Sequence, residues 1–501
     1  MGASPSKPSP SVVRSSKAES INEKDVLQDT PPSIVTSPSS ADGSISLSNV
    51  AAWESSAAAD PKLQLARTIL SHTDIRSALS SRSAHIANAH VFNTEVDFKT
   101  GPVTNQKSSG RCWLFATTNI LRYDIMKKLK LKEFQLSQSY LFFWDKLNKS
   151  NYYLELSIET ADLPIDDRLV NFLSDDLISD GGQWDMVVNL LEHYGVVPLQ
   201  VYPESFHSSL SGPMNSLLMK KLREHAITLR SLSSSLHADS SLTAETILAT
   251  LRAKKEKLMQ EIYTIMSATL GVPPKPDEPF TWDYYDESGK AGKWEGTPTE
   301  FFKAFVGKYS PMDSFSLIND PRNEYSKLYT VSKLGNIWGG RPVLYVNTEI
   351  ENLKAAVVRS IKAGQAVFFG CDVGQSSDSS GGVGIMDTDL FEYEDAFNIS
   401  LSLTKAERLQ MNESAMTHAM VISGVHIDEN GRPVRFKVEN SWGETSGEKG
   451  FNVMSEKWFD QYVYQVVVHK SLAPKELVKV IEDGHAVVLP PWDPMVRFRD
   501  R

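Results

Sequence analysis

One cysteine stands in a sequence context that favours nucleophilic chemistry. Cys112 follows Gly110 and precedes the apolar run Trp113–Ala116, which predicts a buried helix with the cysteine in its first turn. A helix N-terminus stabilises a thiolate through its unpaired N–H groups and its dipole. Gln106 lies upstream on the connecting loop, where its side-chain amide and the backbone N–H of Cys112 would stabilise an oxyanion. These residues predict attack of a thiolate on a carbonyl carbon.

A thiolate nucleophile needs a partner that later protonates the leaving amine, and histidine does this near neutral pH. Among the eleven histidines, His418 stands at the start of the apolar run 419–425, where a core meets a cleft. Asn440 follows a strand-like run and can accept from the imidazole N–H without adding a buried charge. Trp442 would shield that hydrogen bond from water. The predicted catalytic residues are Cys112, His418, Asn440 and Gln106.

Other reactive side chains are interpreted as structural. Cys371 ends an apolar strand, has no helix start beside it and has no histidine nearby in the sequence. His193 follows a Gly-Gly-Gln-Trp loop on a predicted helix. We find no group of residues with the spacing of metal ligands, and thiol chemistry needs no metal. The sequence therefore predicts neither a metal nor another cofactor.

The elements that must position these residues follow from hydrophobic periodicity. Helices are expected early and strands late, with a helical block over residues 210–270 between them. The expected helices are 63–70, the segment from 112 to 125, and 186–193, which Gly195 ends. The expected strands are 343–346, 366–371, 419–425, 435–439 and 464–469. This arrangement predicts an α+β fold with a helical insertion.

Composition limits the class of protein. The chain has 501 residues, a net charge of −10 and two cysteines, so a disulfide framework is excluded and a reducing compartment is favoured. We find neither a membrane-spanning run nor a secretory signal, and we expect a cytoplasmic protein. The negative charge gives no overall attraction to nucleic acid, although local basic runs such as 127–132 leave that alternative open.

Residues 1–60 are dominated by Ser, Pro, Ala and Thr, and we expect them to be a disordered tail. Gly2 opens a segment that fits the pattern for N-myristoylation. We favour a solvated tail over an acylated one, and one acyl chain would not give stable membrane association.

Six segments together resemble a known family. They are Gln106, Gly110–Ala116, Asp180–Met186, Met416–Met420, Val438–Gly443 and Leu489–Met495. These strings resemble the papain-like cysteine peptidases and, within that clan, the bleomycin hydrolase family, over about residues 60 to 495. The resemblance implies a papain-like fold with a helical left half and a β-rich right half. The regions expected from it are 1–60 (tail), 61–205 (helical half), 206–340 (mainly helical insertion for oligomerisation), 341–488 (β half) and 489–501 (tail near the active site).

The resemblance also implies a function. It indicates a cytosolic thiol aminopeptidase that forms a homohexameric ring and acts on peptides and small aminoacyl amides. The implied substrate-binding residues are Gly181, Gly182, Trp442 and Arg501, the last through its terminal carboxylate, which would pair with a substrate amine.

The C-terminal end departs from the family pattern. Relatives usually end in small apolar residues, whereas Val496–Arg501 is bulky and carries three arginines. A basic tail would repel a substrate amine, so endopeptidase action on short peptides is an alternative if the tail is displaced. A ring-forming nucleic-acid-binding protein and a cysteine acyltransferase are further alternatives. The complete set of four catalytic residues argues against the first, and Asn440 in place of an aspartate argues against the second.

Overall fold

The structure is a computed structural model that describes residues 43–97, 101–379 and 383–496. The chain divides into two compact units, Met1–Thr73 and Asp74–Arg501. The expected disorder of residues 1–42 and the modification of Gly2 lie outside the described residues. In the described part, no helix combines the length and the apolar character needed to cross a bilayer.

The described part of the first unit, from residue 43 on, contains two helices, α1 (Leu47–Ala59) and α2 (Pro61–Leu70). The second helix was expected, but the expected disorder up to residue 60 is wrong for Leu47–Ala59. The sequence of α1 is rich in alanine, the residue with the highest helix propensity, and the helix forms without a buried side chain. Asp60 then caps α2 by accepting from the backbone N–H groups of Lys62 and Leu63.

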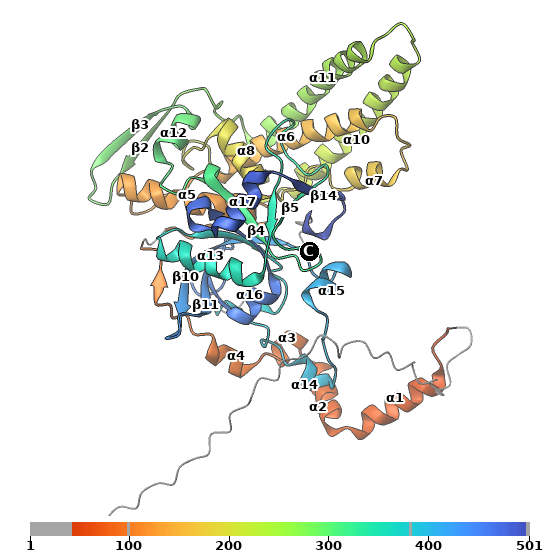
Figure 1. Cartoon of the computed structure of the whole chain (residues 1–501), viewed down its shortest axis with the longest axis vertical. Helices are drawn as coiled ribbons and strands as arrows, with labels where there is room; N and C mark the ends of the chain where they lie inside the picture. Colours follow the sequence, from red (N-terminus) through yellow and green to blue (C-terminus); the bar gives the residue numbers. More distant parts are fainter. Residues whose placement is uncertain (1–42, 98–100, 380–382, 497–501) are drawn as a thin grey trace, which may run out of the picture. The chain divides into compact units, whose positions relative to one another are not determined.

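The second unit is an α+β structure (Figure 1). Its early helices are α3 (Ile75–Ala78), α4 (Arg82–Ala87), α5 (Cys112–Leu129), α6 (Gln138–Glu159), α7 (Arg168–Asp175) and α8 (Trp184–Tyr194). The middle of the chain adds α9 (Phe206–Ser209), α10 (Gly212–His237), α11 (Ala244–Leu270) and α12 (Pro298–Phe305). The later helices are α13 (Ile350–Lys362), α14 (Tyr393–Phe397), α15 (Lys405–Gln410), α16 (Glu456–Tyr462) and α17 (Lys475–Asp483). Short 3₁₀ turns are η1 (Pro311–Asp313), η2 (Lys470–Leu472) and η3 (Pro494–Val496).

Within the described residues, twelve strands form one sheet in the order β14-β5-β6-β4-β13-β7-β10-β11-β12-β9-β8, with β1 also paired to β10. The first of them are β1 (Thr94–Glu95), β4 (Ser314–Ile318), β5 (Lys327–Val331), β6 (Tyr345–Asn347), β7 (Val367–Cys371), β8 (Ser377–Asp378) and β9 (Ile385–Met386). The remaining ones are β10 (His418–Ile427), β11 (Pro433–Glu439), β12 (Phe451–Ser455), β13 (Val463–His469) and β14 (Ala486–Leu489). A separate hairpin pairs β2 (Phe280–Tyr285) with β3 (Ala291–Gly296).

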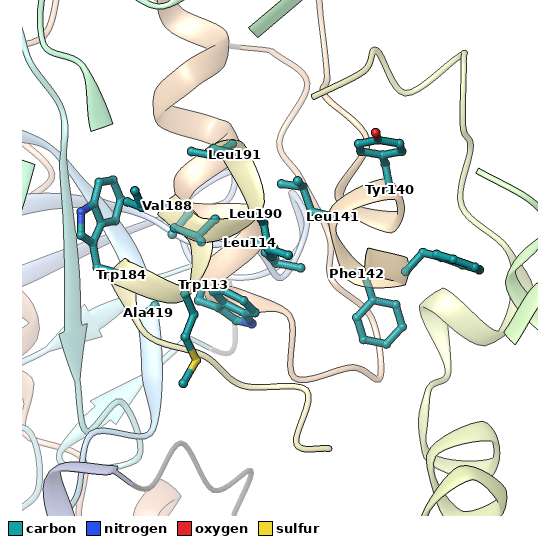
Figure 2. Packing of buried hydrophobic residues seen from close by; sticks show 14 of the residues in the cluster. Trp113, Leu114, Tyr140, Leu141, Phe142, Trp184, Val188, Leu190, Leu191 and Ala419 are labelled. Atoms are coloured by element: carbon teal, nitrogen blue, oxygen red, sulfur yellow. The ribbon is translucent and has the colours of Figure 1, made fainter. Parts of the chain in front are cut away.

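Consecutive side chains point to opposite sides of a sheet, and the central strands are buried on both faces because a core lies on each side. Phe368 and Ala419 face a core shared with α5, α6 and α8, where Trp113 and Trp184 are almost fully buried. Figure 2 shows Trp184 and Val188 of α8 and Leu114 of α5 in this core. The alternate residues, including Phe369, face a second core that α13 covers. This double burial explains why these strands read as continuous apolar runs in the sequence.

The predicted insertion differs from the structure at its end. The helical block 210–270 corresponds to α10 and α11, which pack against each other. Residues up to 340 were also expected to belong to a mainly helical insertion, but β4 and β5 within them are strands of the main sheet. Both strands are five residues long and mix polar with apolar residues, so neither forms a continuous apolar run like that of residues 343–346.

Asp185, in the first turn of α8, connects the helical side to the sheet by accepting from the backbone N–H of Leu344 at 3.0 Å. Burial raises the pKa of Asp185 from 3.8 to about 6, against the lowering effect of that hydrogen bond. An acid with a raised folded-state pKa gains stability as the pH falls through 6, and above pH 6 its ionised form costs free energy.

Replacing Asp185 with asparagine should therefore raise the free energy of unfolding at pH 8 by about 2–3 kcal/mol. It should also flatten the dependence of stability on pH between about 4 and 6. Urea unfolding across this range measures both effects. A variant that is less stable than the wild type at pH 8 would show instead that the ionised carboxylate stabilises the fold.

Candidate active site

The predicted nucleophile begins a helix. Cys112 is the first residue of α5 and is almost fully buried. No acidic residue lies in the first turn of α5, and the guanidinium of the preceding Arg111 makes no cap hydrogen bond. That guanidinium is buried and pairs with Glu204 at 2.9 Å. No acidic side chain in the first turn therefore competes for the partial positive charge of the helix end, which would stabilise a thiolate or an oxyanion at Cys112.

The predicted base and its orienting residue are in direct contact. His418, the first residue of β10, has its Nε2 atom 3.0 Å from Oδ1 of Asn440. The same Oδ1 accepts the backbone N–H of Ser441 at 2.8 Å, which identifies this atom as the oxygen. Nε2 of His418 must then carry the proton, and Nδ1 is left as the basic nitrogen. The Trp442 ring lies 4.9 Å from the imidazole, between centroids.

His418 is buried, and this sets its charge. Burial lowers the pKa of His418 to about 4, and the hydrogen bond to Asn440 raises it in part. The isolated imidazole is therefore neutral near pH 7 and can accept a proton. A thiolate formed close by would favour the imidazolium in return, because opposite charges stabilise each other at short distance.

The amide of Gln106 is held at both ends. Its Oε1 accepts the hydroxyl of Ser441 at 2.7 Å, and its Nε2 donates to the carbonyl of Ser109 at 2.7 Å. An amide nitrogen has two N–H groups, so one remains for another acceptor. Because both bonds fix the direction of the amide, that N–H is preorganised for a developing negative charge.

The loop that carries Gln106 pairs with the segment after Asn440. Gln106 donates its backbone N–H to the carbonyl of Ser441 at 2.8 Å, and Gly443 donates to Thr104 at 3.0 Å. Gly443 has φ of +83°, and a Cβ there would lie 2.6 Å from the side chain of Asn105. Only glycine fits this conformation and this close approach. The pairing brings the Gln106 loop to the Asn440 loop.

A buried ion pair joins the nucleophile helix to the Asn440 strand. Arg122 of α5 donates to Oε1 of Glu439 at 2.7 Å, and the hydroxyl of Tyr123 donates to Oε2 at 2.7 Å. Glu439 ends β11 and immediately precedes Asn440. Cys112 itself belongs to the same buried core as Ala419, the neighbour of His418, and α5 packs against β10.

The loop before α8 is fixed on the nucleophile helix. The carboxylate of Asp180 accepts the backbone N–H of Gly110 at 3.1 Å, and its carbonyl accepts Nε1 of Trp113 at 2.7 Å. Burial opposes ionisation of Asp180, but the ammonium of Lys146 and neighbouring hydrogen bonds outweigh it and hold the pKa below its usual range. Gly182 lies so close to Trp113 that an added Cβ would be 2.7 Å from the ring.

A cavity of about 170 Å³ opens beside this loop. Gly181, Gly182 and Gln183 line one side, and Pro491 of the C-terminal segment lines another. Trp492 packs under the guanidinium of Arg168, whose central carbon lies 3.8 Å from the ring centroid. Pro491, near the described end of the chain, therefore lies at the cavity beside the Gly181–Gln183 loop, which itself contacts Trp113 of α5 through Gly182.

Comparison with known proteins shows to which family this chain belongs. A sequence profile of the Peptidase C1-like family matches residues 44–496. The chain belongs to this family. It is 43% identical to human bleomycin hydrolase, over 87% of this chain and 94% of that protein. It is also 43% identical to cysteine proteinase 1, mitochondrial, of Saccharomyces cerevisiae, over 90% of this chain and 92% of the relative.

A solved structure from the same family confirms the fold. The crystal structure of PepW from Lactobacillus rhamnosis superposes with a TM-score of 0.85 at 43% identity, covering 91% of this chain and 99% of that one. The chain is thus a cysteine peptidase with the papain-like α+β fold, related to bleomycin hydrolase. The resemblance described from the sequence motifs is confirmed at this level.

In this C1-like peptidase, His418 contacts Asn440 and Trp442, Gln106 is bonded to Ser441 beside Asn440, and Cys112 lies in the adjoining core. Gly181 and Gly182 line the neighbouring cavity. Arg501 lies outside the described residues. Glu351, Glu456 and Asp460 lie close enough for a cation site, but the ammonium of Lys354 is within ion-pair distance of all three.

Three positioning residues escaped the sequence reasoning. They are Ser441, which orients Gln106, Glu439, which pairs with Arg122, and Asp180, which holds the loop before α8. Each lies inside a motif that was recognised, next to a residue with an assigned role. One sequence feature could have indicated Glu439: a charged residue at the end of an apolar strand. Such a residue is expected to be buried, and a buried charge requires a partner.

Proposed function

We propose that this peptidase is an aminopeptidase that hydrolyses N-terminal peptide or amide bonds through a Cys-His-Asn acyl-enzyme mechanism. The observation that carries the proposal is the hydrogen bond from His418 to Asn440 beside a Gln106 amide that is fixed at both ends. Peptides and small aminoacyl amides are the proposed substrates.

The chemistry follows from the assigned atoms. Nδ1 of His418 takes the proton of the Cys112 thiol, and the sulfur attacks the carbonyl carbon. The remaining N–H of Gln106 and the backbone N–H of Cys112 stabilise the oxyanion that forms. When the tetrahedral intermediate collapses, His418 gives its proton to the leaving amine. Water, deprotonated by His418, then attacks the thioester, releases the acid and restores the thiol.

We propose that the C-terminal segment restricts cleavage to the N-terminal residue of a substrate. Arg322 pairs with Asp493 at 2.9 Å, Met495 is buried, and Pro491 lines the cavity beside Gly181. These contacts fix the chain up to residue 495 next to the proposed binding cleft. A segment that continues into the non-primed side of the cleft would block longer peptides, so that only a free N-terminus fits.

The test compares an aminoacyl amide that carries a free amine with the same amide acetylated on the amine. The wild type should cleave only the free-amine substrate. A chain that ends at Met495 should cleave both, because the block is removed while the contacts of Asp493 remain. Cleavage of both substrates by the wild type would contradict the aminopeptidase assignment and support the endopeptidase alternative. The matched control is the wild type treated with a thiol alkylating reagent, which should cleave neither.

We also propose a homohexameric assembly that uses the helical pair α10 and α11. Large apolar side chains on these helices are exposed, namely Leu217, Ile227, Leu248 and Tyr263. Contiguous apolar patches on a protein surface mark interaction sites, and these side chains are the ones from which such a patch on α10 and α11 would be built. Sedimentation of the full chain tests this assembly, and a monomer at micromolar concentration would exclude it.

A cytoplasmic location is proposed on the scarcity of cysteine. The yeast relative is named as a mitochondrial protein. Fractionation of cells that express the full chain decides between the two compartments.

A further inference from the structure

The loop that leads into His418 is attached to a residue with no assigned role. In the antiparallel pair of β7 and β10, His418 lies opposite Cys371. Asp372 is therefore the first residue beyond β7, at the end of the sheet where His418 begins its strand. The backbone N–H of Thr417 donates to the carbonyl of Cys371 at 2.9 Å, and the N–H of Asp372 donates to Tyr462 at 3.0 Å.

The carboxylate of Asp372 collects donors from the segment directly before His418. Its Oδ2 accepts the hydroxyl of Ser414 at 2.8 Å and the backbone N–H of Ala415 at 3.4 Å. Its Oδ1 accepts the hydroxyl of Thr417 at 3.2 Å. Gln375 adds a fourth donor at 3.3 Å. Asp372 is 4% exposed, so water does not replace these bonds easily.

A second layer of contacts supports the same loop. The hydroxyl of Tyr464, on β13, donates to Ser414 at 2.7 Å, and Ser414 donates in turn to Asp372. The ammonium of Lys405 lies 4.8 Å from the centroid of the Tyr464 ring. Ser414 is fully buried. The hydroxyl of Ser414 thus has its acceptor and donor roles both defined, which fixes its position.

We propose that Asp372 is a positioning residue. It holds the 414–417 segment and, through that segment, keeps the imidazole of His418 placed to exchange a proton with Cys112. This inference rests on the proposed Cys-His-Asn mechanism. An ionised carboxylate is suited to the role because it offers only acceptors to four donors. Asparagine has nearly the same shape but presents an NH₂ group to some of those donors, so the loop must shift.

The test uses Asp372→Asn, Ser414→Ala and the matched control Asp389→Asn, whose carboxylate is exposed and pairs with Lys457. Asp372→Asn should lower kcat at least about tenfold with little change in KM, because a displaced base impairs chemistry more than binding. The rate of Cys112 alkylation by iodoacetamide near neutral pH should fall in parallel. Ser414→Ala should show a smaller loss in both measurements, and Asp389→Asn should match the wild type.

Two results would overturn the proposal. One is a kcat and an alkylation rate equal to those of the wild type in both Asp372→Asn and Ser414→Ala. The other is a lower melting temperature with an unchanged alkylation rate, which indicates a structural role alone. If the wild type fails to hydrolyse amides at all, the proposed function is wrong. The alkylation rates still report whether Asp372 affects the environment of Cys112, so the two failures are distinguishable.

Discussion

Replacing Cys112 with alanine is expected to lower the turnover of an aminoacyl amide by about 10⁵-fold or more, because loss of a nucleophile removes the covalent route entirely. Replacing Cys371 with alanine should change turnover by less than about threefold. The contrast has a physical cause. Burial raises the pKa of the Cys371 thiol well above its usual value, and Asp372 and Cys112 raise it further. A thiol that stays protonated is a poor nucleophile.

Initial rates measured on purified variants check this prediction, with circular dichroism to confirm folding. Alkylation followed by mass spectrometry supplies an independent readout, since the reagent should modify Cys112 first. If loss of activity followed modification of Cys371 instead, the assignment of the nucleophile would have to be reversed. The structure places Cys371 opposite His418 in the sheet, although the two are far apart in the sequence. Cys371→Ala is therefore a stringent control, because it removes a thiol that lies close to the predicted base.

The largest expected effect on stability is at Glu439. Glu439→Gln should lower the free energy of unfolding by about 3–5 kcal/mol, because it leaves the buried guanidinium of Arg122 without its countercharge. Both side chains are about 1% exposed, so solvent does not screen the loss. The exposed pair of Lys457 and Asp389 is the comparison, and Asp389→Asn should cost less than about 1 kcal/mol.

Urea unfolding measures the loss of unfolding free energy in Glu439→Gln and in Asp389→Asn. A double variant then tests whether the unpaired charge of Arg122 causes the larger loss. Arg122→Met combined with Glu439→Gln should recover most of the stability lost in Glu439→Gln alone, because no unpaired charge remains. A double variant that is as unstable as the sum of the single variants would show that the two side chains contribute independently. Any loss of activity in Glu439→Gln at low urea would reflect displacement of the neighbouring Asn440.

Local secondary structure in this chain was predictable from the sequence, whereas the pairing of segments far apart in the chain was not. The helix that begins at Cys112 and the strand that begins at His418 follow from short apolar patterns. The bond from Ser441 to Gln106 joins residues 335 positions apart, and nothing in either segment specifies the other. The short strands β4 and β5 pair with strands far along the chain, β13 and β14, and their mixed polar and apolar residues did not indicate that pairing.

The distance along the chain between Gln106 and Ser441 has a consequence for synthesis of the protein. Ribosomes add about 5–20 residues per second, so a separation of 335 positions corresponds to roughly 15–70 seconds of translation. Early in that interval the emerging chain carries Cys112 but lacks His418, Asn440 and Ser441, whose hydroxyl donates to the Gln106 amide. The proposed site is therefore incomplete in the nascent chain until Ser441 has been added.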